Sequence, residues 1–130
     1  MLNSRRLRVT QRKTLEGALL ATGTPFREDQ DPEQFLDSLR LFMYGTSGIR
    51  RAGSAALDLA YVAAGRFDGY WEFGVKPWDI AAGMLLVQEA GGLAGDMNPS
   101  KKVLENGNIL AANPKVFTEM QRKLAQIQKV

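Results

Sequence analysis

The sequence contains no cysteine and no histidine among its 130 residues. The absence of cysteine excludes disulfides, thiol catalysis and thiolate-bound zinc. The absence of histidine removes the most common general base, the Ser-His-Asp relay and the commonest transition-metal ligand. Hydrolytic chemistry would therefore need another way to activate water, and carboxylates that hold a hard cation such as Mg²⁺ are the natural remaining route.

The chain also lacks any apolar run near the roughly 20 residues that span a bilayer, and its N-terminus lacks the apolar stretch of a signal peptide. We therefore expect no contact with a membrane and a cytoplasmic location. Hydrophobic residues make up 45% of the sequence and charged residues 24%, which is typical of a globular protein. We expect residues 1–130 to form a single domain.

Basic residues are concentrated at the N-terminus, although the net charge is only +3. Five of them precede the first acidic residue: Arg5, Arg6, Arg8, Arg12 and Lys13. One interpretation is a basic arm that contacts an anionic partner. The other, which we favour, is a strand at 5–10 with one solvated face, because apolar and basic residues alternate there.

Apolar periodicity and turn residues predict strands and helices that alternate along the chain. We expect strands at 5–10, 17–22, 67–73, 93–97 and 108–112, an extended piece at 49–52, and helices at 31–43, 54–64, from Pro77 and from Pro114. The helix from Pro77 is apolar most of the way round, so we expect it to be deeply packed, and we expect Trp71 and Trp78 to pack as well. This alternation predicts a three-layer α/β/α sandwich.

Two carboxylates lie at a predicted strand-to-helix transition. Glu72 is near the end of a strand, and Asp79 is in the first turn of the helix from Pro77. Ligands bind beyond the carboxyl ends of strands in open α/β sheets, and a helix dipole stabilises a carboxylate in its first turn by roughly 0.3–1 kcal/mol. Acidic residues in first turns are also ordinary helix caps, so the spacing alone leaves both interpretations open.

Four segments resemble the C-terminal half of the inositol monophosphatase family, in particular its bacterial extragenic-suppressor subgroup. They are Leu19–Gly23 (LLATG), Arg51–Ala60 (RAGSAALDLA), Trp78–Gly83 (WDIAAG) and Glu89–Gly92 (EAGG). The resemblance covers nearly the whole chain and is weakest between Asn98 and Asn106. It implies the C-terminal domain of the sugar-phosphatase fold that the family shares with fructose bisphosphatase.

The resemblance implies a role for each matched residue. Asp79 matches a catalytic residue that ligates a metal and also meets a substrate hydroxyl, and Glu72 matches a residue that binds a ring hydroxyl. Three residues match a tight segment at a helix N-terminus that contacts the sugar alcohol: Gly53, Ser54 and Ala55. The two preceding arginines either approach the substrate or form ordinary surface ion pairs: Arg50 and Arg51. We interpret Lys76 and Asp58 as structural or solvated.

The family's Asp-Pro-Ile/Leu-Asp-Gly-Thr motif, the metal-binding glutamate before it and the water-activating threonine do not occur in this sequence. We therefore expect a C-terminal substrate-binding domain whose missing partner is the N-terminal metal-site domain. An excised domain, a split gene product and a truncated reading frame remain open as explanations. The resemblance implies Mg²⁺-dependent hydrolysis of inositol monophosphate or a related sugar-alcohol phosphate, with the isolated chain inactive.

Two alternatives belong to other functional classes. The chain could be a non-enzymatic module that contacts RNA or the transcription machinery through its basic N-terminal residues or the helix from Pro114, as is implied for some of the suppressor subgroup. It could also be an inactive fragment. Family members are often homodimers, so the resemblance also implies self-association.

Overall fold

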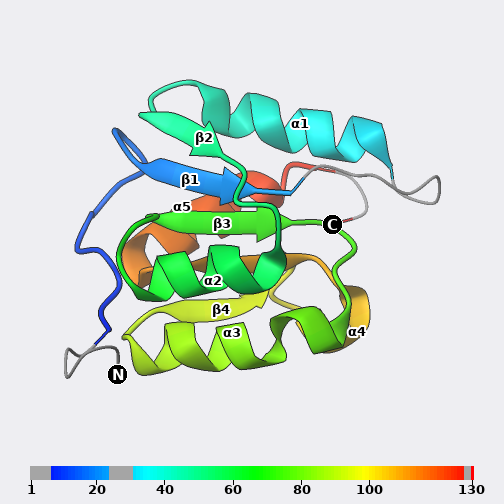
Figure 1. The fold of residues 1–130 in the computed structure, drawn as a ribbon. Coiled ribbons are helices and arrows are strands. Elements are labelled where there is room, and N and C mark those ends of the chain that lie inside the picture. Colours follow the sequence, from blue (N-terminus) through cyan, green and yellow to red (C-terminus); the bar gives the residue numbers. More distant parts are fainter. Residues whose placement is uncertain (1–6, 24–30, 128–129) are drawn as a thin grey trace.

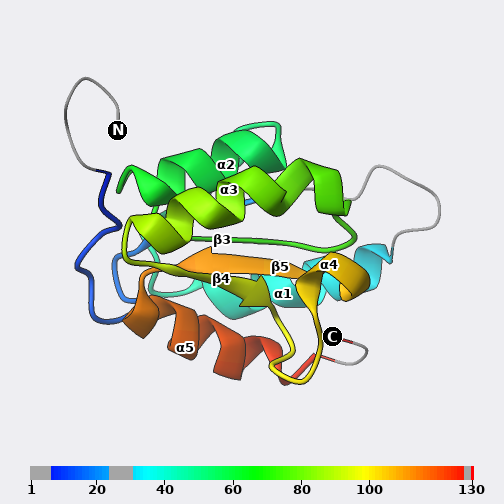
Figure 2. The same cartoon turned by 90° about the horizontal axis from the view of Figure 1, so that it is seen from below.

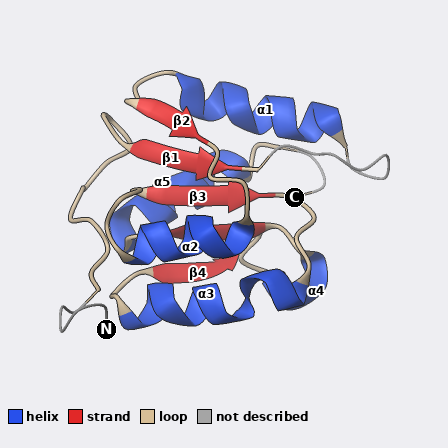
Figure 3. Ribbon diagram, viewed as in Figure 1, coloured by secondary structure: helices blue, strands red, loops and turns tan. Residues whose placement is uncertain are grey.

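A five-stranded mixed sheet forms the middle of the computed structural model, which describes residues 7–23, 31–127 and 130 (Figure 3). The strands are β1 (Leu19–Thr22), β2 (Gly48–Arg50), β3 (Gly69–Glu72), β4 (Leu93–Asp96) and β5 (Ile109–Ala112). Their order in the sheet is β2-β1-β3-β5-β4. Strand β1 is parallel to β2 and to β3, while β5 is antiparallel to β3 and to β4. The three parallel strands therefore end at the same edge of the sheet.

Helices cover both faces of the sheet (Figures 1 and 2). They are α1 (Pro32–Met43), α2 (Ala55–Ala63), α3 (Pro77–Glu89), α4 (Val103–Asn106) and α5 (Pro114–Leu124). Helices α2 and α3 lie side by side on one face, and α1 and α5 lie on the other (Figure 2). The predicted three-layer α/β/α sandwich is confirmed. The short helix α4 lies between Asn98 and Asn106, where the family resemblance is weakest.

The core lies on both faces of β3, because successive side chains of a strand point to opposite faces. Tyr70 packs under α2 and α3, and Trp71 packs with Phe42 of α1 on the other face. The rings of Trp71 and Phe42 have centroids 4.7 Å apart. The Trp71 Nε1–H donates to Ser38 Oγ at 2.8 Å, so the buried indole keeps its hydrogen bond.

Side-chain caps set the start of three helices at residues that accept hydrogen bonds from first-turn amides. Asp31 caps α1, Ser54 caps α2 and Asn113 caps α5. The predicted helices at 31–43 and 54–64 begin at the first two of these caps, and the predicted helices from Pro77 and Pro114 begin at those prolines. No helix in the described part of the chain has the length and apolar character needed to cross a membrane.

The expected strand at 5–10 is wrong for residues 7–10, which form no strand; Arg5 and Arg6 lie outside the described residues. This segment runs past the end of α3, where the Val9 amide donates to the Ala90 carbonyl at 3.1 Å. Thr10 Oγ1 accepts from Asn113 Nδ2 at 3.1 Å. The alternation of apolar and basic residues reflects one buried side chain, Val9, rather than pairing with the sheet.

The expectation that α3 is deeply packed is also wrong. Ile80, Gly83 and Val87 are buried, but Trp78 is 76% exposed and Leu85 is 57% exposed. Helix α3 belongs to an outer layer, so only one of its faces meets the sheet and α2 (Figure 2). Trp71 is a core residue as expected, whereas Trp78 is not. Within the described residues, nothing covers the outer face of α3.

Candidate active site

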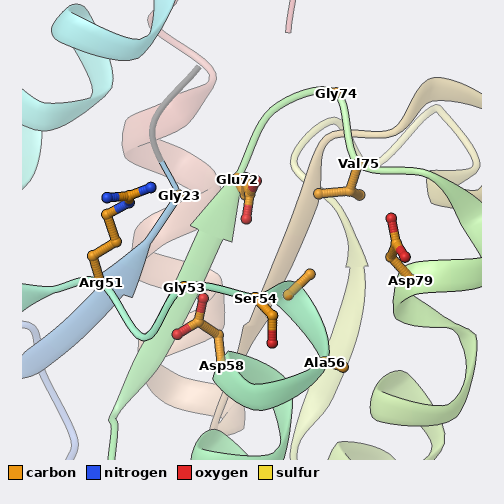
Figure 4. Close-up of a pocket in the computed structure, with 11 residues that line it drawn as sticks. Gly23, Arg51, Gly53, Ser54, Ala56, Asp58, Glu72, Gly74, Val75 and Asp79 are labelled. Carbon is orange, nitrogen blue, oxygen red and sulfur yellow. The ribbon is translucent and has the colours of Figure 1, made fainter. Parts of the chain in front are cut away.

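A pocket of about 310 Å³ opens at the edge of the sheet where the three parallel strands end (Figure 4). Segments that follow β1, β2 and β3 form it, together with the first turns of α2 and α3. This is the edge at which α/β sheets bind ligands. Its lining residues are Gly23, Arg51, Gly53, Ser54, Ala55, Ala56, Asp58, Glu72, Gly74, Val75 and Asp79.

The N-terminus of α2 forms one wall of the pocket. The chain leaves β2 and turns at Gly53, whose φ of +101° favours glycine. Ser54 then caps the helix, with its Oγ accepting from the Leu57 amide at 3.1 Å. Other amides of a helix's first turn have no partner within the helix, so this wall presents backbone donors to a ligand.

Glu72 is the last residue of β3 and lies at the centre of the pocket (Figure 4). The Tyr70 hydroxyl donates to Glu72 Oε1 at 2.6 Å. Burial, and secondarily the Glu72 carboxylate, raise the pKa of Tyr70, so its hydroxyl stays protonated as a donor. Gly23 lies against the Glu72 carboxylate so closely that a β-carbon on Gly23 would overlap it. Gly23 is not among the predicted site residues, although it directly follows a buried strand and ends Leu19–Gly23, one of the segments that resemble the family.

Asp79 forms the far side of the pocket from the first turn of α3, and its side chain is exposed. The loop between β3 and α3 is fixed by two hydrogen bonds to the segment before β5. The Gly74 amide donates to Asn108 Oδ1 at 3.3 Å, and the Val75 amide donates to the Gly107 carbonyl at 2.9 Å. These hydrogen bonds fix the start of α3, so that Asp79 lines the same pocket as Glu72 and Ser54 (Figure 4).

Asp58 is a buried carboxylic acid on α2 beneath the pocket, and only 1% of its surface is exposed. Burial, and to a smaller extent the Glu72 carboxylate, raise the pKa of Asp58 from 3.8 to about 7, whereas the Ala52 backbone and Arg51 lower it. Its Oδ1 has no hydrogen-bond partner among the described residues. The sequence predicts that Asp58 is structural or solvated, and its burial excludes the solvated alternative. Asp58 follows the capping Ser54 by four residues, and residues four apart lie on the same side of a helix. This spacing was the signal in the sequence that Asp58 lies near the pocket.

The structure brings most of the expected site residues together in this pocket. They are Gly53, Ser54, Ala55, Glu72 and Asp79. Arg50 does not line the pocket: it ends β2, is exposed, and its guanidinium lies 3.5 Å from the Ile49 carbonyl. Arg51 lines the pocket instead. Successive side chains of an extended segment point in opposite directions, so only one of two adjacent arginines reaches the site.

The described residues do not make up a metal site by themselves. Within residues 7–23, 31–127 and 130, no group of three or more Asp, Glu, His or Cys side chains could hold a metal ion. Magnesium takes oxygen ligands and near-octahedral geometry, and one carboxylate plus waters holds it weakly. Asp79 fits as one carboxylate of a larger ligand set, and the remaining ligands would have to come from other residues.

Residues 1–129 match the inositol monophosphatase family. The chain belongs to this family. It is 59% identical over 118 residues to the Nus factor SuhB of Pseudomonas aeruginosa, an alignment that covers 89% of this chain and 44% of that protein. It is 53% identical over 112 residues to an inositol-1-monophosphatase of Rhizobium meliloti, which covers 86% of this chain and 42% of that protein.

Solved structures of this family have the same fold. The extragenic suppressor protein suhB from Bartonella henselae is 44% identical, with a TM-score of 0.88 over 98% of this chain and 49% of that one. Inositol monophosphatase from Anabaena is 38% identical, with a TM-score of 0.87 over 98% of this chain and 51% of that one. The chain thus spans about half the length of the relatives it matches.

Proposed function

We propose that this chain is the substrate-binding part of a phosphoric monoester hydrolase that acts on inositol monophosphate or a related sugar-alcohol phosphate. The observation that carries the proposal is the pocket itself. Helix-terminus donors of α2 and the carboxylates of Glu72 and Asp79 line a single hollow at the carboxyl edge of the sheet. Membership of the inositol monophosphatase family supports this class of reaction.

Each wall of the pocket has a proposed part in binding a polyhydroxylated ring. Gly53, Ser54 and Ala55 would offer donors from the N-terminus of α2 to ring oxygens or to the phosphate. Glu72 would accept a hydrogen bond from a ring hydroxyl while Tyr70 holds the carboxylate in place. Arg51, rather than Arg50, would lie beside the substrate, because it lines the pocket.

Asp79 would both accept a hydrogen bond from the hydroxyl beside the ester and act as one ligand of Mg²⁺. When bound, Mg²⁺ would activate water for attack on the phosphate and stabilise the leaving alkoxide. The described residues hold too few carboxylates for this on their own. We therefore infer that the active enzyme includes a second polypeptide segment, the metal-site half of the family, and that the isolated chain is inactive.

The outer face of α3 is the surface on which we propose that this second segment docks. It carries exposed apolar residues: Trp78, Ala81, Ala82, Leu85 and Leu86. Trp78 adjoins Asp79 in the sequence, so a segment packed on this face would lie next to the carboxylate whose metal it must share. Exposed apolar surface of this kind is typical of an interface, and the relatives are about twice as long as this chain.

An Asp79→Asn substitution tests the role of this carboxylate in the chain recombined with a metal-site half from a family member. Turnover of inositol 1-phosphate should fall by about 100-fold or more, because an amide oxygen is a poorer Mg²⁺ ligand than a carboxylate oxygen. Substitutions of residues that only support a metal ligand already cost about 10–100-fold, and loss of the ligand itself should cost at least as much. Asp37→Asn, an exposed carboxylate on α1, is the matched control and should leave turnover unchanged. Near-normal activity of the Asp79 variant would refute the assignment.

A second candidate function is contact with RNA or the transcription machinery. Its support is that several relatives are named as Nus factors, together with exposed basic residues on and beside α5. Lys13, Lys115 and Arg122 line one shallow hollow there. Binding of an RNA oligonucleotide through this cluster should weaken steeply as salt rises and should be lost in Lys115→Glu, whereas sugar-phosphate hydrolysis should require Asp79 and Mg²⁺.

A further inference from the structure

Gly23 and Glu72 lie side by side at the carboxyl ends of two adjacent parallel strands (Figure 4). Thr22 of β1 is in register with Trp71 of β3, so the residues that follow them meet at the edge of the sheet. The Thr22 hydroxyl also donates to the Trp71 carbonyl at 2.8 Å, and both side chains are buried. The two strands are therefore held together directly beside the pocket.

Backbone conformation does not explain the glycine at position 23. Gly53 has a φ of +101°, whereas the φ of Gly23 lies outside the left-handed region that favours glycine. A side chain at position 23 would instead meet the carboxyl group of Glu72. A β-carbon there would lie 2.3 Å from Cδ and from Oε1, and 2.5 Å from Oε2. Because these atoms end a flexible side chain, a substitution at position 23 would displace the carboxylate rather than the strand.

Tyr70 holds the same carboxylate in one orientation. It lies two residues before Glu72 on β3, so both side chains point to the same face of the sheet. Its ring is fully buried beneath α2 and α3, and its hydroxyl donates to Glu72 Oε1 at 2.6 Å. An O–H···O bond of this length is typical of a carboxylate acceptor, which makes strong hydrogen bonds. Displacing the carboxylate would therefore break a hydrogen bond whose donor is fixed by packing.

We propose that Gly23 is a specificity-determining residue: its missing side chain leaves room for the Glu72 carboxylate that Tyr70 holds, and this fixed acceptor selects cyclic polyols by the position of one ring hydroxyl. The part of this inference that concerns the ligand rests on the proposed function. A hydrogen bond weakens steeply when its direction is wrong, so an acceptor held in one place distinguishes a hydroxyl from its epimer. Loss of a hydrogen bond to a charged group lowers affinity by about tenfold or more.

The first test needs no ligand and compares crystal structures of the full 130-residue chain and its Gly23→Ala variant. In the variant the carboxylate of Glu72 should move away from Tyr70, beyond the roughly 3.5 Å at which a hydrogen bond is lost. Gly95→Ala on β4 is the matched control, because a β-carbon there approaches nothing more closely than Phe117 at 4.0 Å, and it should leave the carboxylate in place. An unmoved carboxylate in Gly23→Ala would overturn the inference.

The second test measures, by NMR titration, the affinities of the same chains for myo-inositol and a panel of its single-hydroxyl epimers. The wild type and Gly95→Ala should prefer one configuration at one ring position by about tenfold or more, and Gly23→Ala should lose most of this preference. Tyr70→Phe keeps the buried ring and removes only the hydroxyl, so it should relax the preference in the same way. Gly23→Ala added to Glu72→Ala should change nothing further, because the displaced group is gone.

The preference among epimers separates a specificity role from a merely structural one. Equal binding of all epimers by the wild type, an unchanged preference in Gly23→Ala, or additive effects of Gly23→Ala and Glu72→Ala would overturn the inference. Should Gly23→Ala fail to fold, a wild-type preference retained by Tyr70→Phe would overturn it equally. A wild type that binds no cyclic polyol, with the carboxylate displaced in Gly23→Ala, would support the hold on Glu72 and contradict the proposed function.

Discussion

At the residue scale, the pocket contains carboxyl groups in three different environments. Asp79 is exposed at a helix N-terminus, Glu72 accepts from a buried tyrosine, and Asp58 is buried beneath a turn. Burial sets Asp58 apart from the other two, because it disfavours the charged form of the carboxyl group.

The raised pKa of Asp58 predicts how stability changes with pH. Its pKa is about 7 in the folded chain and 3.8 ordinarily, so between these values the folded state binds more protons than the unfolded state. The contribution of Asp58 to the free energy of unfolding is therefore fully present below about pH 4. It falls by about 1.4 kcal/mol per pH unit as the pH rises towards 7, and it is lost above that pH.

Urea unfolding of wild type and Asp58→Asn between pH 4 and 8 measures this dependence. The variant should lose less stability over this range and should be more stable than the wild type at pH 8, because its amide carries no charge to bury. Parallel curves for the two proteins would show that Asp58 ionises as freely in the fold as in the unfolded chain.

At the element scale, the contact between α2 and α3 sets the shape of the pocket, because each helix supplies one wall. Gly83 of α3 lies directly over Leu59 of α2, and a β-carbon there would come within 2.7 Å of Leu59. Gly83→Val should therefore push the helices apart and reduce the free energy of unfolding by roughly 1–3 kcal/mol, measured by urea unfolding.

Gly95→Ala on β4 is the control for this substitution. A β-carbon on Gly95 would approach nothing more closely than the Phe117 ring, at 4.0 Å. Its stability should stay within about 0.5 kcal/mol of the wild type. An equal loss of stability in both variants would mean that a side chain at position 83 disturbs the fold no more than a side chain at position 95 does.

Elements with strong local signals were predictable from the sequence. The helix at 54–64, the strand at 17–22 and the helix from Pro114 were each predicted from apolar periodicity and turn residues, and the structure contains them as α2, β1 and α5. Leu7–Thr10 was not predictable, because alternation cannot tell pairing with a strand from docking against the end of a helix. The choice of Arg51 over Arg50 likewise depends on the path of the chain after β2.

At the scale of the whole molecule, the apolar character of α3 was visible in the sequence, but the exposure of its outer face was not. The apolar periodicity predicts that Trp78 and Leu85 are buried. It does not show whether the residues that bury them belong to this chain. Both are exposed in the structure. The proposed second segment would account both for the metal ligands that the described residues lack and for the exposed apolar face of α3.

A Leu85→Glu substitution tests the proposed docking surface. It places a charge in the apolar face of α3 and should weaken association with a metal-site half of the family by at least tenfold, measured by calorimetric titration, because a buried charge without a partner is costly. Gln88→Glu, an exposed position on the same helix, is the control and should bind as the wild type does. Equal binding by both variants would place the interface elsewhere.

The most direct test of the central claim is phosphate release from inositol 1-phosphate by the purified chain, with and without Mg²⁺, alone and after addition of a metal-site half from a family member. The account predicts no release by the chain alone and Mg²⁺-dependent release after recombination. Mg²⁺-dependent release by the chain alone that Asp79→Asn abolishes would contradict it, because these 130 residues would then build a complete catalytic site unaided.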